Sequence, residues 1–171
     1  MRVGLLFVAL MLLTSVAMAQ THDHAAPVVK HVDGREHPEQ IPDEVAYFNY
    51  FMGRSVSADV ALPAEEQRHI ENGIRMLQLE TKDELQFRLA MTEFRSKFEH
   101  FNAVYTAKAE KGRATVFDFW YGPGGIAQIV AETRARLTKG LSKNGQGSFE
   151  LEVLRMRHNT TCDGCQLGGA K

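Results

Sequence analysis

The sequence predicts an all-α protein: a bundle of four or five helices with a disordered N-terminal leader and a loose C-terminal tail. Three observations support this fold class. Apolar residues recur every three or four positions over long segments, which places them on one face of an α-helix. Residues typical of helix N-termini come before these segments, and breaks rich in glycine or proline separate them. The longest segment carries a mostly aromatic seam, which predicts a helix that packs along its whole length.

Residues 1–19 have the three parts of a secretory signal peptide. Arg2 supplies the positive charge, residues 3–13 form a short apolar run, and Ala17-Met18-Ala19 is a small-residue cleavage site. The run is shorter than the roughly 20 residues that a membrane span needs, and no second long run follows. We therefore expect a secreted or periplasmic protein that begins at Gln20 and has no transmembrane segment after signal removal.

Residues 20–40 are expected to form a disordered leader, because few of their side chains can offset the entropy of ordering by burial. The leader contains four histidines: His22, His24, His31 and His37. The helical domain is expected to span residues 41–157. Residues 158–171 are expected to form the tail.

Two short helices open the predicted domain. Asp43 is a suitable cap for the first, and Gly53 is a suitable stop. The first helix is strongly aromatic, so we expect it to be largely buried. Pro63 is a favourable first-turn residue for the second helix, whose apolar stripe contains Ile70, Ile74 and Leu77.

The central helix is the spine of the predicted bundle. Thr81 and Glu84 have the spacing of a capping box, and Gly112 ends the helix. The seam residues follow one another at helical spacing: Phe87, Met91, Phe94, Phe98, Phe101 and Tyr105. Charged residues occupy the opposite side, as a solvent-facing surface requires.

The C-terminal half has a less regular pattern. Residues 115–121 predict a buried connection or a single helical turn, and a further helix is expected over residues 126–141. Asn144-Gly145-Gln146-Gly147 predicts a break, after which Ser148 could cap a last element over residues 148–157. That element fits a helix or a strand almost equally well, and the helical context favours a helix.

Charge is uneven along the chain. Residues 20–107 hold 9 basic and 15 acidic side chains, whereas residues 108–171 hold 10 basic and 6 acidic ones. We interpret this as attraction between the two halves of one fold. The near-neutral total gives no argument for nucleic acid as a partner, because phosphate binding needs a concentrated basic surface.

The two cysteines form the sharpest local motif, Cys162-Asp163-Gly164-Cys165. In an oxidising compartment the simplest outcome is a disulfide between Cys162 and Cys165. The rival is a metal site, in which His158, Cys162 and Cys165 supply three ligands suited to zinc or copper(I) and a fourth comes from elsewhere.

A second metal hypothesis concerns the new N-terminus. If cleavage follows Ala19, the amine of Gln20, two backbone amides and the ring of His22 could surround copper(II) or nickel(II) in a plane. The plainer interpretation is a polar leader that happens to contain histidines.

Two functional hypotheses follow from the sequence. The first is an exported, non-enzymatic helical module that binds an unknown protein or small ligand. The second is a metal-handling or thiol-redox protein that uses His22, His158, Cys162 and Cys165. No catalytic residues are assigned, because no serine-centred motif is present and the cysteine pair lies in a tail.

Overall fold

The computed structural model describes residues 31–57 and 61–163. Within them the protein is a helical bundle with one very small sheet, which confirms the predicted fold class. The elements in chain order are β1 (His31–Asp33), η1 (Pro38–Gln40), α1 (Asp43–Met52), α2 (Ala64–Arg75), α3 (Thr81–Ala109), α4 (Val116–Tyr121), α5 (Ile126–Gly140), α6 (Lys143–His158) and β2 (Thr161–Asp163).

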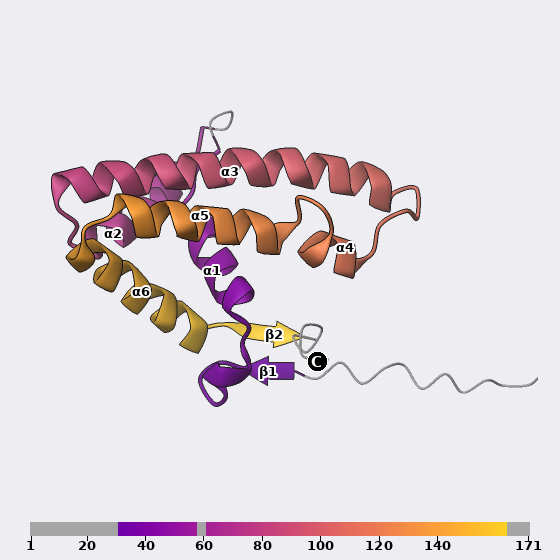
Figure 1. Cartoon of the computed structure of the whole chain (residues 1–171), viewed down its shortest axis with the longest axis horizontal. Helices are drawn as coiled ribbons and strands as arrows, with labels where there is room; N and C mark the ends of the chain where they lie inside the picture. Colours follow the sequence, from indigo (N-terminus) through magenta and orange to yellow (C-terminus); the bar gives the residue numbers. More distant parts are fainter. Residues whose placement is uncertain (1–30, 58–60, 164–171) are drawn as a thin grey trace, which may run out of the picture.

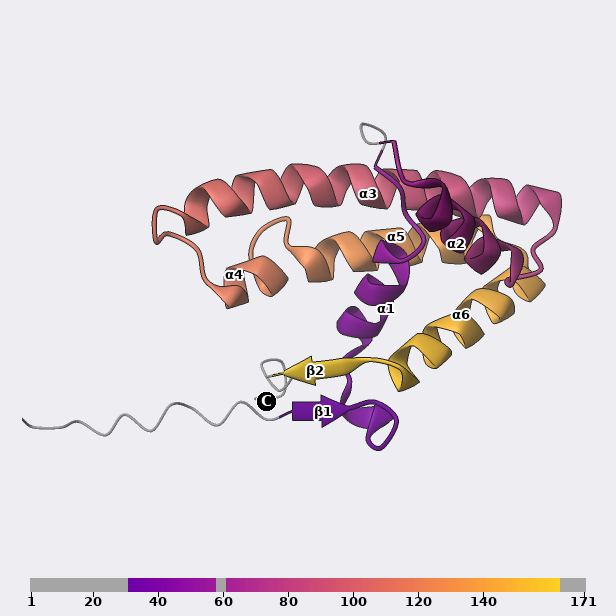
Figure 2. The same cartoon turned by 180° about the vertical axis from the view of Figure 1, so that it is seen from behind.

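The 29-residue helix α3 is the spine of the molecule, as the sequence predicts. Helix α5 runs beside it for most of the α5 length, and both views show the two ribbons together (Figures 1 and 2). Helix α1 contacts α3, α5 and α6, so it lies at the centre of the bundle. Its buried residues include Tyr50 and Phe51, which agrees with the expectation that this helix is largely buried.

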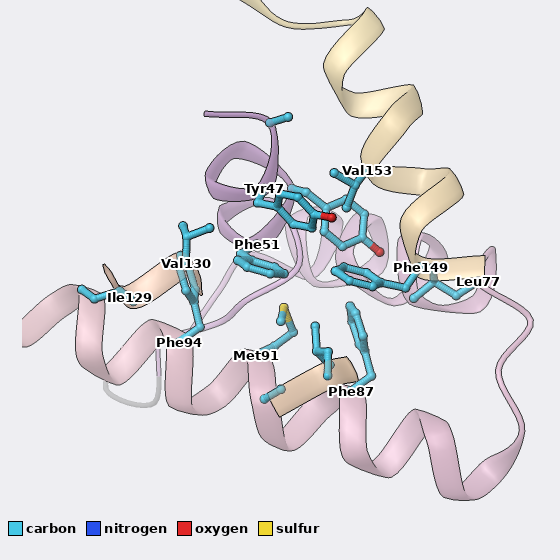
Figure 3. Packing of buried hydrophobic residues seen from close by; sticks show 14 of the residues in the cluster. Tyr47, Phe51, Leu77, Phe87, Met91, Phe94, Ile129, Val130, Phe149 and Val153 are labelled. Atoms are coloured by element: carbon cyan, nitrogen blue, oxygen red, sulfur yellow. The ribbon is translucent and has the colours of Figure 1, made fainter. Parts of the chain in front are cut away.

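The core is a cluster of aromatic rings contributed by α1, α3 and α6 (Figure 3). Phe51 and Phe94 lie 5.1 Å apart between ring centroids, and Phe149 lies 5.6 Å from Tyr50. The rings are mostly tilted or edge-on to one another, the arrangements that aromatic pairs prefer. The first half of the α3 seam, Phe87, Met91 and Phe94, therefore lies in the core, as expected from its spacing.

The outer part of the seam is covered by α4. Phe101 and Tyr105 contact the ring of Phe119, and Trp120 contacts Phe48 of α1. The segment predicted as a buried connection or a single helical turn is thus a short helix at the far end of the bundle, and none of its residues is fully buried.

Helix capping differs from the prediction at α3. Glu80 is the N-cap, Thr81 is already helical, and no side chain caps the helix. The Glu84 carboxylate instead accepts a hydrogen bond from Arg88, at 2.9 Å. A capping box does form at α4, where Thr115 and Asp118 bond reciprocally.

The last helix begins five residues earlier than predicted. Ser142 caps α6, and its side chain accepts a hydrogen bond from the backbone of Gly145 at 3.1 Å. The Asn144–Gly147 segment is therefore the first turn of a helix and not a break. Residues 148–157, which fitted helix or strand, are helical throughout.

Parts of the predicted leader and tail are folded together. β1 pairs with β2 in antiparallel fashion, with Val32 opposite Cys162. Val32 is 2% exposed, so β1 contributes to the core. The domain boundaries expected after residues 40 and 157 stay predictions. Residues 1–30 and 164–171, which include the predicted signal peptide, lie outside the described part of the chain.

In residues 31–57 and 61–163, every helix falls short of the length or apolar character that crossing a bilayer requires.

Candidate functional site

A groove of about 470 Å³ lies between α1 and α5, and we call it the α1–α5 groove. Its apolar floor comes from α5: Ala127, Val130, Ala131 and Ala135. Its polar lining comes from both helices: Asp43, Glu44, Tyr47, Arg134, Thr138 and Lys139. The groove is within the range of roughly 300–1,000 Å³ that small-molecule sites occupy.

The floor exists because of the spacing of small residues along α5. Ala127, Ala131 and Ala135 recur every four positions, so they share one face of the helix. Because each of these side chains is only a methyl group, the surface of α5 is depressed next to the larger side chains of α1. Val130 is 3% exposed beneath this face and closes the floor towards the core.

Arg134 lies at the centre of the polar lining. Its guanidinium carbon is 4.5 Å from the centroid of the Tyr47 ring, a cation–π contact. Its nearest carboxylate contacts are long: 3.6 Å to Asp43 and 3.7 Å to Glu150. Charge-assisted hydrogen bonds are typically about 2.7–2.9 Å, so this guanidinium keeps donor capacity for a ligand.

Tyr47 forms the wall beneath Arg134. Its hydroxyl donates a hydrogen bond to Glu150 of α6. Burial raises the pKa of the Tyr47 phenol well above its usual range, and the Glu150 carboxylate raises it further. The hydroxyl therefore stays protonated at physiological pH and serves as a donor that holds α1 to α6.

The charges of the lining are not all neutralised within the fold. The Asp43 carboxylate is paired with Arg157 of α6 as well as with Arg134. By contrast, the side chains of Glu44 and Lys139 have no ion-pair or hydrogen-bond partner in the part of the chain that the structure describes.

These two charges give the groove a polarity. Glu44 acts on Tyr121, whose pKa is raised chiefly by burial and secondarily by this carboxylate, so Glu44 lies near the N-terminal end of α5. Lys139 lies in the last turn of α5. An elongated ligand would thus meet a carboxylate at one end, an alanine floor in the middle and cations at the other end.

The structure does not bring the predicted metal ligands together within the described residues. His158 ends α6 and Cys162 lies in β2, but residues 31–57 and 61–163 contain no group of three side chains suited to a metal ion. His22 and Cys165 lie outside those residues. The zinc or copper site and the Cys162–Cys165 disulfide therefore stay predictions.

Sequence reasoning missed the α1–α5 groove. The sequence does contain alanine at every fourth position of α5. Such a row of small residues forms a groove only when a second helix packs next to it, which the sequence does not show.

The comparisons with known proteins found no match among family models, curated proteins or solved structures.

Proposed function

We propose that this protein is an exported, non-enzymatic binding module whose ligand occupies the α1–α5 groove. The ligand class is an elongated amphiphile with an anionic head group. The observation that supports this most directly is the alanine floor of the groove, which is flanked by Arg134, whose carboxylate contacts are long, and by Lys139, which has no ion-pair partner among the described residues.

The polarity of the groove orients such a ligand. A carboxylate or similar anion near Lys139 would gain the ammonium charge and could accept hydrogen bonds from Arg134. The apolar chain would then lie over Ala131 towards Ala127. The opposite orientation would place the anion beside Glu44, where like charges repel.

The export part of the proposal rests on the signal-like residues 1–19. Cell fractionation followed by mass spectrometry of the protein would give both its location and its N-terminus. A chain outside the cytoplasm that begins at or near Gln20 supports export, and an intact chain that stays inside the cell with residues 3–13 retained contradicts it.

The ligand class is tested by calorimetric titration of dodecanoate into the processed protein. We expect saturable binding at one site, and weaker binding of dodecyltrimethylammonium, because the head-group charge is reversed. Ala131→Leu should reduce dodecanoate affinity about tenfold by filling the floor. Lys139→Gln should reduce it about threefold through loss of one exposed charge.

Two matched variants serve as controls. Ala103→Leu changes an exposed alanine on α3, and Lys143→Gln removes a lysine at the start of α6, both outside the groove lining. Neither should alter dodecanoate affinity. Absence of saturable binding, or equal losses in groove and control variants, would refute this ligand class.

A further inference from the structure

The far end of the molecule presents a second surface, which we call the α4 tip and define as residues 104–121. It comprises the last turns of α3, the connecting loop and α4. Both views show it projecting at one end of the long axis, away from α2 and α6 (Figures 1 and 2). It shares no residue with the α1–α5 groove.

The α4 tip exposes large apolar side chains. Val116 is 60% exposed, Phe117 is 58% exposed and Tyr121 is 38% exposed, and Val104 is also exposed on α3. Phe117 and Tyr121 are four positions apart on one helix face, with ring centroids 5.4 Å apart. Exposed apolar residues scattered singly are ordinary, but two aromatic rings in contact on one exposed helix face indicate an interaction surface.

The opposite face of α4 fixes these exposed rings in place. Phe119 packs 5.1 Å from the ring of Tyr105, and Trp120 packs 5.6 Å from Phe48. The Thr115–Asp118 capping box closes the N-terminus of the helix. The aromatic face is therefore presented by an anchored helix.

The tip also carries cations. Lys108 lies in the last turn of α3, and Lys111 and Arg113 lie between α3 and α4. None of the three forms an ion pair within residues 31–57 and 61–163. The tip also holds Glu110 and Asp118. The Asp118 carboxylate accepts hydrogen bonds from the Thr115 amide at 2.8 Å and from its hydroxyl at 2.7 Å, so it is engaged within the cap.

We propose that the α4 tip docks on the surface of an anionic lipid bilayer. Aromatic side chains such as Phe117 and Tyr121 suit the boundary between head groups and acyl chains. The lysines and arginine of the tip suit negatively charged head groups, which complement them in charge. The projecting position allows the rings to enter a flat surface before the rest of the bundle meets it.

Co-sedimentation with lipid vesicles tests the proposal. Processed protein is mixed with vesicles of phosphatidylcholine, with and without phosphatidylglycerol. We expect co-sedimentation with the anionic vesicles at low salt, and a loss of this binding at high salt. Pure phosphatidylcholine should bind much more weakly.

Two double variants test the cations and the aromatic rings of the α4 tip separately. Lys111→Gln with Arg113→Gln should lower partitioning into anionic vesicles about 25-fold, at about fivefold per cation. Phe117→Ser with Tyr121→Ser should lower it by about tenfold or more. The controls are Lys82→Gln with Lys143→Gln for charge, and Leu85→Ser with Leu89→Ser for exposed apolar residues on α3; these should bind as the unaltered protein does.

Circular dichroism of each variant establishes that the fold is retained. Failure of the unaltered protein to bind anionic vesicles overturns the proposal, and the surface would then belong to a protein partner. Equal losses in the tip and control variants overturn it as well. Dodecanoate titration of the same variants keeps this result separate from the groove, because tip substitutions should leave that affinity unchanged.

Discussion

Asp83 illustrates how a single buried carboxylate organises a helix start. It is 3% exposed at the beginning of α3. The amide of Ser142 donates a hydrogen bond to it at 3.0 Å, and the Ser142 hydroxyl donates another. Ser142 in turn caps α6. These two bonds lower the pKa of the Asp83 carboxyl from its ordinary value of 3.8, the side-chain bond contributing most.

Removing this carboxylate should destabilise the protein. Asp83→Ala should lower the free energy of unfolding by about 1–2 kcal/mol at neutral pH, because the Ser142 donors lose their acceptor. Glu80→Ala is the control, since Glu80 is an exposed neighbouring carboxylate; its effect should stay within about 0.5 kcal/mol. Urea denaturation followed by circular dichroism measures both.

The same pair of proteins should differ in pH dependence. A carboxyl whose pKa is lowered in the folded state stabilises the fold when ionised. The advantage of the unaltered protein over Asp83→Ala should thus be complete above the unfolded pKa, near 3.8. It should disappear as the pH falls through the lower, folded value. An advantage that persists unchanged at still lower pH would contradict the ionic role of Asp83.

At the scale of the element, α6 shows that two glycines in one helix can have opposite effects. A side chain at Gly145 would collide with the Asp83 carboxylate, whereas the position of Gly147 faces open space. Neither glycine has a positive φ angle, so backbone conformation does not distinguish them. The sequence segment Asn144–Gly147 nevertheless resembles a break.

Alanine substitution should therefore change stability in opposite directions. Gly147→Ala should raise the free energy of unfolding by about 0.5–1 kcal/mol through better helix propensity. Gly145→Ala should lower it by about 1–3 kcal/mol, because the methyl group overpacks against Asp83. Thermal unfolding of the two variants is the measurement. A gain in stability at both positions would show that Asp83 can move aside.

At the scale of the whole molecule, hydrogen bonds and ion pairs join the two ends of the described chain. The amide of Gly34 donates a hydrogen bond to the carbonyl of Thr160 at 2.9 Å, and Asp43 pairs with Arg157. Glu93 of α3 also pairs with Arg136 of α5. Each of these ion pairs joins the acidic first half of the chain to the basic second half, in line with the attraction inferred from the uneven charge.

The closure of the ends is tested at Val32. Val32→Ala should cost about 1.5 kcal/mol of unfolding free energy, from the loss of buried methyl groups of β1. Val56→Ala, at a position that is 39% exposed, is the matched control and should cost less than about 0.5 kcal/mol. If chemical denaturation gave equal losses of unfolding free energy for Val32→Ala and Val56→Ala, β1 would add nothing to the core. Residues 31–33 would then behave as part of the disordered leader that the sequence predicts.

The local pattern accounts for most of the helices. The seam through Phe87 and Phe94 predicted the longest helix and its role in the core, because a period near 3.6 residues needs no knowledge of neighbours. Boundaries depended on longer-range contacts. Thr81 failed as a cap, and Ser142 succeeded with help from Asp83, 59 residues earlier in the chain.

The sequence by itself determined that this protein is helical, where its central helix runs and that Phe87, Met91 and Phe94 enter the core, since side-chain periodicity acts within one segment. Only the tertiary structure decided that residues 31–33 fold back onto residues 161–163, and that alanines of α5 become the floor of a groove. Those outcomes depend on contacts between segments far apart in the chain. Loop closure and packing bring such segments together, and the residue pattern within one segment does not specify which distant segment it will contact.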